Sequence, residues 1–213
     1  MIRINEKSNY ISDKWCESPI EKQFLHEIVK YLELGVELWL QLPFQTSIGN
    51  FRVDFLIKKG NTEYVIELDG KGYHSEKKDI WRDSFLLGEK RVKAIVRFKA
   101  KDIAHNLYEC LYFLSQIFPT TFSERGKTNL TTLLEIENKE SVDMNIKDNI
   151  FKCINKFSFS KIEYNEGEKI YHSDIVITLM DNIEFIAWKD NYDFAISNSI
   201  FDVERLIAEY SKI

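Results

Sequence analysis

Hydrophobic and polar residues follow two alternating periods along the first half of the chain. Ser18-Pro19-Ile20-Glu21 is typical of a helix start, with serine as the N-cap, proline in the first turn and glutamate completing a capping box. This helix should stop at Gly35. Period-two alternation then predicts strands at about 36–46, 50–58 and 63–69.

The same alternation continues to about residue 117. A second helix is predicted from about Glu76 to Leu87, where Gly88 ends it. Val92–Phe98 has the apolar run of a buried strand, and residues 102–117 return to a helical period. The predicted order is therefore α-β-β-β-α-β-α, which belongs to the α/β class.

The chain changes character after Pro119. The polar run Thr120–Thr128 indicates a boundary between an N-terminal domain, 1–118, and a small acidic α+β domain, 119–213. For the second domain the pattern predicts strands at 157–164, 174–180 and 183–189, turns at Asp181-Asn182 and Asp190-Asn191, and a closing helix near 200–211.

Two carboxylates stand out on the predicted hairpin around Lys59-Gly60-Asn61-Thr62. If Gly60 and Asn61 form a two-residue turn, Asp54 lies directly opposite Glu67, and Arg52 opposite Asp69. Opposed side chains have Cβ atoms about 4.5–5.5 Å apart, where like charges destabilise a sheet. A bound divalent cation would explain why both carboxylates are present. The alternative is an ordinary surface hairpin.

Composition narrows the class of protein. The chain has 213 residues, 44% of them hydrophobic, which is enough for one core and a smaller second one. Its three cysteines, Cys16, Cys110 and Cys153, have no CxxC or Cys/His spacing, so we expect free thiols in a reducing compartment and no zinc. No apolar stretch approaches 18 residues, so we expect a cytoplasmic protein without a membrane partner.

Charge is distributed unevenly, although the net charge is −5. Residues 52–101 carry 13 Lys and Arg against 8 Asp and Glu, whereas residues 121–213 carry 11 against 17. The first segment could hold a polyanion such as DNA, or it could simply be a solvated surface. The candidate phosphate contacts are Lys71, Lys77, Lys78, Arg82, Arg97 and Lys99. Trp81 and Tyr73 could stack on bases, but side chains of this kind more often pack in a core.

Five short motifs occur in a fixed order between residues 16 and 117. They are SPIE at 18–21, VDF at 53–55, ELDG at 67–70 followed by His74, RD at 82–83 and VRF at 96–98. Together they resemble the PD-(D/E)XK nuclease superfamily, particularly its very-short-patch-repair-like branch. The resemblance implies a restriction-endonuclease-like αβββαβ core with a mixed sheet flanked by helices. It also implies a metal-dependent DNA endonuclease that leaves a 5′-phosphate.

The resemblance implies a Mg²⁺ site, in which Mn²⁺ substitutes. Asp54 and Glu67 would be the primary ligands, with the backbone carbonyl of Leu68 as a third. Glu21 would reach the metal shell directly or through water, or it would only complete the capping box. Carboxylate-held Mg²⁺ is suited to phosphodiester hydrolysis because it activates water and balances the charge that develops on oxygen.

The site departs from the wider superfamily in one position. Asp69 stands two residues after the acid, where a lysine is usual, so His74 would act as the general base, or Lys71 would move into the space. The resemblance includes both Asp69 and His74 in the catalytic set. Alternatively, Asp69 only pairs with Arg52, and His74 is an ordinary loop histidine. The zinc ligands of very-short-patch-repair enzymes are missing, so mismatch-specific repair is not expected.

We therefore expect a DNA endonuclease with a role in defence against foreign DNA, repair or element mobility. The alternative is a catalytically silent nucleic-acid-binding or adaptor subunit, which the missing lysine favours. In that case residues 119–213 would dock a partner protein, and self-association through the same residues is also open. A third possibility, an RNA-directed nuclease, differs only in its substrate.

Overall fold

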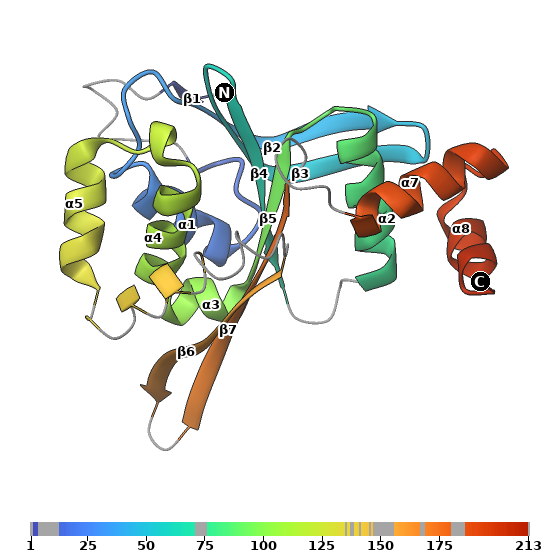
Figure 1. Cartoon of the computed structure of the whole chain (residues 1–213). Coiled ribbons are helices and arrows are strands. Elements are labelled where there is room, and N and C mark those ends of the chain that lie inside the picture. Colours follow the sequence, from blue (N-terminus) through green and yellow to red (C-terminus); the bar gives the residue numbers. More distant parts are fainter. Residues whose placement is uncertain are drawn as a thin grey trace.

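The computed structural model shows a mixed β-sheet covered by helices on both faces (Figure 1). It describes residues 2–3, 13–70, 76–134, 136, 139–140, 142–144, 146, 156–166, 169–179 and 186–212. The predicted α/β class is confirmed.

Seven strands form the sheet over the described residues, in the order β1-β2-β3-β4-β5-β7-β6. Strands β4 and β5 are parallel, and the other neighbours are antiparallel. The strands are β1 (Ile2–Arg3), β2 (Glu37–Thr46), β3 (Gly49–Lys59), β4 (Thr62–Asp69), β5 (Ala94–Lys99), β6 (Lys156–Glu166) and β7 (Lys169–Leu179). The three strands predicted after the first helix and the buried strand near Val92–Phe98 are thus confirmed as β2 to β5.

The helices fall into two groups (Figure 1). One face of the sheet carries α1 (Pro19–Ile28), α3 (Ala100–His105), α4 (Leu107–Ile117) and α5 (Glu124–Leu133), together with the short 3₁₀ turn η1 (Pro119–Thr121). The other face carries α2 (Glu76–Gly88), α7 (Ile186–Asn198) and α8 (Val203–Tyr210). None of the helices in the described part of the chain is long and apolar enough to cross a membrane.

The hairpin between β3 and β4 has the predicted register. Lys59 pairs with Thr62, and the ladder continues in step to Phe55 and Ile66. Gly60 has φ 58°, a conformation that glycine adopts without steric cost, which explains the tight turn.

The first helix is shorter than predicted, because the chain after it pairs elsewhere. It ends at Ile28 rather than near Gly35. The carbonyl of Tyr31 accepts a hydrogen bond from Ser123 N (3.0 Å), and Glu33 N donates to the carbonyl of Thr121 (2.9 Å). These long-range bonds draw the segment away from helical geometry, so local periodicity overestimates the helix.

Two further boundaries differ from the sequence prediction. The helix predicted over 102–117 is broken at Asn106, whose φ of −125° and ψ of 38° are not helical. The predicted strand 183–189 and the turn at Asp190-Asn191 are wrong, because Ile186–Asn198 is helical. The turn at Asp181-Asn182 lies outside the described residues. The closing helix is confirmed as α8.

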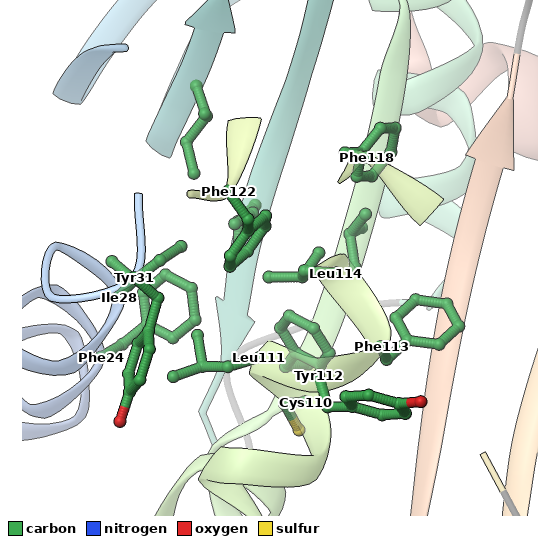
Figure 2. Close-up of a cluster of buried hydrophobic side chains, with 14 of the residues drawn as sticks. Phe24, Ile28, Tyr31, Cys110, Leu111, Tyr112, Phe113, Leu114, Phe118 and Phe122 are labelled. Carbon is green, nitrogen blue, oxygen red and sulfur yellow. The ribbon is translucent and has the colours of Figure 1, made fainter. Parts of the chain in front are cut away.

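The largest hydrophobic core lies under α1 and α4 (Figure 2). Aromatic rings fill much of it; Tyr64 of β4 stacks on Phe118 with ring centroids 3.8 Å apart. Phe122 and Leu130, which follow Pro119 in the chain, are buried in the same core. Cys110 is a buried free thiol and Cys16 a partly buried one, as expected, while Cys153 lies outside the described residues.

Elements from beyond residue 118 also extend the sheet. Strand β7 pairs antiparallel with β5, from Ala94 opposite Leu179 to Phe98 opposite Ile175. The polar run Thr120–Thr128 forms η1 and the first turn of α5, which Ser123 caps by accepting from Gly126 N. The division at residue 118 into two domains remains a prediction.

Helices α7 and α8 pack on α2 through an aromatic cluster. Trp81 is 3% exposed and lies edge-on to Tyr210, with centroids 5.5 Å apart. Phe85 contacts Tyr192 in the same way at 5.3 Å. Trp81 is therefore a packing residue, which is the alternative that its sequence context favoured. Tyr73 lies outside the described residues.

The last residue of α2, Gly88, lies directly against Tyr192 of α7. A Cβ added there would lie 2.4 Å from the ring of Tyr192, so we expect Gly88→Ala to destabilise the fold by about 1–3 kcal/mol. For a chain of this size that is a fall of roughly 2–4 °C in Tm per kcal/mol, measurable by thermal unfolding. In a Tyr192→Ala background the same change should have almost no effect. An equal loss in both backgrounds would contradict the steric explanation.

Candidate functional site

Glu21 lies in the first turn of α1, where the local sequence builds a helix cap. Ser18 Oγ accepts a hydrogen bond from Glu21 N (3.1 Å), as an N-cap serine should. The Glu21 carboxylate accepts from the backbone N–H of Glu17 (2.8 Å), one residue before the N-cap, instead of from Ser18 itself. Glu21 is 7% exposed, and only Oε2 carries this bond, so capping leaves Oε1 available within the described structure.

Gln41 joins Glu21 to the sheet. Its amide nitrogen donates to Glu21 Oε2 (2.9 Å) and to Asp54 Oδ1 (3.3 Å). One side-chain amide therefore bridges two carboxylates from different elements. Because the two acids share a single donor group, they are held close together.

Strand β2 is distorted at this bridging residue. Gln41 has φ 51°, a conformation that non-glycine residues rarely adopt inside a strand. Leu40 packs on the core under α1, whereas Leu42 packs on the cluster at the α2 face, although two residues this far apart share one face of a regular strand. Trp39 also packs on the α2-side cluster, so Gln41 would lie on that face in a regular strand. The distortion instead directs its amide to Glu21 of α1.

Asp54 occupies the matching position on β3. The β2–β3 ladder pairs Leu40 with Phe55 and Leu42 with Val53, and Asp54 falls between them. Its Oδ2 accepts from Leu68 N on β4 (2.9 Å). Burial raises the pKa of Asp54 and the negative charge of Glu21 raises it further, while hydrogen bonds from Leu68 and Gln41 oppose the rise.

Glu67 is neutralised from the other face of the sheet. It is 3% exposed, and its carboxylate forms an ion pair with Arg82 of α2. Burial raises the pKa of Glu67 to about 8, because the positive charges of Arg82 and Arg97 offset only part of the cost of burying a carboxylate. Asp54 and Glu67 were predicted to lie directly opposite each other. The structure instead gives Asp54 the Leu68 N–H and Glu67 the Arg82 guanidinium.

The end of the β3–β4 ladder explains this arrangement. Pairing between the two strands extends to Phe55 and Ile66, whereas β4 stays paired with β5 as far as Asp69 and Lys99. The next pair of the predicted register, Asp54 with Glu67, is therefore not formed. Asp54, the next residue, takes the backbone N–H of β4.

The predicted pair of Arg52 with Asp69 is replaced for the same reason. Arg52 pairs with Glu17 (2.5 Å), and Asp69 with Arg97 of β5 (3.0 Å). Arg97 also makes two hydrogen bonds to Asp83 of α2, of 2.9 and 2.7 Å. Arg97 is thus fixed in a buried network that ties α2 to the sheet. Its burial argues against the phosphate contact that the sequence suggested.

The other candidate phosphate contacts have varied surroundings. Arg82 is held by Glu67, and Lys78 pairs with Glu204 of α8 (2.5 Å). Lys77 is exposed beside a shallow pocket that Trp81 and Tyr210 also line. Lys99 is exposed at the end of β5. Lys71 and the predicted general base, His74, lie outside the described residues.

The described residues contain no group of three or more His, Cys, Asp or Glu side chains that could hold a metal. Glu21 and Asp54 nevertheless provide two carboxylates, and Mg²⁺ is commonly bound by one or two carboxylates with water and phosphate oxygens as the other ligands. The chemistry of this pair fits Mg²⁺. Glu67 would have to leave Arg82 to join them.

The raised pKa of Glu67 predicts a specific pH dependence. Below its ordinary pKa of 4.5 the carboxyl is protonated in the folded and unfolded chain alike. Between that pH and about 8 only the unfolded chain releases the proton, so the free energy of unfolding should fall, by up to about 1.4 kcal/mol per pH unit.

Urea unfolding at several pH values should detect this effect. Glu67→Gln lacks the titrating group, so its unfolding free energy should rise relative to that of the wild type as the pH increases from about 5 to about 8. Glu63→Gln serves as the control, because Glu63 lies on the same strand but pairs with Lys58. Parallel pH profiles for wild type and Glu67→Gln would exclude a raised pKa.

Sequence reasoning missed two parts of this site. Nothing in the local pattern marked Gln41, which the strand distortion makes a bridging residue. Arg82 was predicted to contact phosphate, whereas it pairs with Glu67 of β4, and the next residue of α2, Asp83, pairs with Arg97 of β5. A clue was available in the sequence, because a buried Glu67 requires a positive partner from another element.

Comparisons with protein-family models, with curated proteins and with solved structures found no match for this chain.

Proposed function

We propose that this protein is a metal-dependent endonuclease that hydrolyses phosphodiester bonds of DNA. The observation that carries the proposal is the convergence of Glu21 and Asp54, from α1 and β3, on the single amide of Gln41. Both acids are largely removed from water. Two carboxylates held together in this way form a suitable site for a divalent cation.

The proposed chemistry divides among the residues of this chain. Glu21 and Asp54 would hold Mg²⁺, which when bound supplies an activated water and positive charge for the developing oxyanion. Leu68 N–H fixes the orientation of the Asp54 carboxylate. Glu67 and Asp69, with their arginine partners, position α2 against the end of the sheet. His74 remains the proposed general base.

The order of the elements supports the same proposal. Helix α1, strands β2, β3 and β4, helix α2 and strand β5 follow one another as the PD-(D/E)XK core requires, and the sheet is mixed. The five motifs that resemble the very-short-patch-repair-like branch lie on these elements. Membership of that superfamily remains part of the proposal.

Conversion of supercoiled plasmid to open-circular or linear DNA tests this function. The purified protein should cut with Mg²⁺ or Mn²⁺ and should not cut in EDTA. An RNA substrate in parallel decides between the two polymers. No cleavage of either polymer with either metal would refute the nuclease.

One observation favours a second candidate, a nucleic-acid-binding or adaptor subunit without catalysis. Arg82 already neutralises Glu67, so this acid has no need of a metal. Metal titration by calorimetry separates the two functions. A nuclease should bind Mn²⁺ and lose that binding in Asp54→Ala, whereas an adaptor should bind nucleic acid equally well with either side chain.

A further inference from the structure

A tight turn precedes α1 and presents a tryptophan to solvent. Cys16 N donates to the carbonyl of Asp13 (2.9 Å), so Lys14 and Trp15 occupy the two central positions of the turn. Trp15 is 61% exposed. It belongs to none of the three hydrophobic clusters that the described residues form.

The turn is fixed in place on both sides. The Asp13 carboxylate lies 3.6 Å from Lys22 Nζ and 3.6 Å from His26 Nε2, and both of these residues are on α1. Cys16 packs against the main core. Trp15 is therefore exposed at a defined position on the surface and is held there by its neighbours.

The turn is connected to the carboxylate pair through Glu17. Glu17, two residues after Trp15, donates its backbone N–H to the Glu21 carboxylate. Because consecutive Cα atoms are 3.80 Å apart, the Cα of Trp15 is within about 7.6 Å of that of Glu17. Burial raises the pKa of the intervening Cys16 thiol to about 11, and Glu21 and Asp54 both contribute to the rise, which is consistent with their proximity.

We propose that Trp15 is a stacking platform for an unpaired nucleobase of the substrate, one or two nucleotides from the phosphate held at Glu21 and Asp54. This proposal rests on the proposed function and specifies its substrate as single-stranded or locally unpaired nucleic acid. An exposed indole offers a flat π-face that every base can stack on.

The charge beside the ring selects a nucleic acid over a protein partner. Lys14 Nζ lies over one face of the Trp15 ring, 5.2 Å from its centroid, so a base stacked on the opposite face would bring its phosphate near an ammonium group. A π-face next to a cation is the combination that single-strand-binding surfaces use.

Fluorescence anisotropy with a short labelled single strand, and with its blunt duplex, tests the proposal in Ca²⁺ and in EDTA. Trp15→Ala should raise the Kd for the single strand roughly 5- to 150-fold, with a smaller effect on the duplex. Trp15→Phe should restore most of the affinity. Lys14→Ala should weaken the binding of both the single strand and the duplex. It should also reduce the salt dependence of the binding constant by about one released counter-ion.

Phe201→Ala is the matched control, because Phe201 is another exposed aromatic (46%) and lies in the connection between α7 and α8. The Phe201→Ala variant should bind the single strand with the affinity of the wild type. If the wild type binds and Trp15→Ala binds equally well, the assignment of Trp15 falls while the proposed function stands. If the wild type binds neither polymer, the proposed function fails as well. Unchanged affinity with an altered oligomeric state would place Trp15 in a protein contact and overturn the proposal.

Discussion

Asp54→Ala should abolish DNA cleavage and lower Mn²⁺ affinity more than about 100-fold. Substituting even an outer-shell partner of a metal ligand lowers metal affinity or activity about 10–100-fold, so loss of a carboxylate ligand should exceed that range. The change also removes the acceptor of the Leu68 N–H bond. Calorimetry for the metal and plasmid cleavage for the activity measure the two effects separately.

Two further variants control for folding. Asp54→Asn keeps one oxygen to accept from the Leu68 N–H but loses the second oxygen, which accepts from Gln41, and it removes the charge, so it should fold and still lose the metal. Glu63→Gln changes a glutamate of β4 outside the site and should cut DNA like the wild type. Cleavage by Asp54→Ala at the wild-type rate would remove Asp54 from the metal site.

Asp83→Ala should destabilise the fold by about 3–5 kcal/mol. Arg97 is 9% exposed and makes two hydrogen bonds to Asp83 and one to Asp69, so truncation of Asp83 leaves a buried guanidinium with only part of its neutralising charge. Urea unfolding followed by circular dichroism measures the change.

A double variant separates a buried charge from lost packing. Replacing both partners, as Asp83→Leu with Arg97→Met, removes the unpaired charge and should recover most of the lost stability. Asp193→Ala removes a carboxylate from an ion pair with Lys189 in which both side chains are about half exposed, and should change stability little. A similar loss of stability in Asp193→Ala and Asp83→Ala would show that the burial of the Arg97–Asp83 pair does not increase its contribution to stability.

The register of the β3–β4 hairpin could be predicted because it depends on neighbouring residues alone. A two-residue turn at Gly60 fixes each pair by arithmetic, and apolar alternation fixes which strands are buried. The same register correctly placed Phe55 opposite Ile66. The predicted register failed from Asp54 onward, because the pairing of β3 with β4 ends at Phe55. A hairpin turn determines which residues pair but not where the pairing stops.

The remaining differences depend on partners far away in the sequence. Arg97 takes Asp83 and Asp69 because parallel pairing of β5 with β4 and packing of α2 bring them together. The φ of Gln41 is set by two carboxylates that no local pattern links to it. The sequence predicted a strand at 183–189 and a turn at Asp190-Asn191 where Ile186–Asn198 is helical, because the apolar residues show no clear helical period and packing on α2 determines the form.

The position of β5 inside the sheet has a consequence for how the chain folds during synthesis. Its neighbour β4 precedes it, but β7 begins 70 residues after β5 ends at Lys99. At a synthesis rate of roughly 5–20 residues per second, that side of β5 waits about 4–14 s for its partner. An apolar strand edge left open for seconds is a site for pairing with other nascent chains. Chains that terminate before β6 would retain this edge permanently and should aggregate, so β7, held by β6, protects the edge of β5 from pairing with other chains.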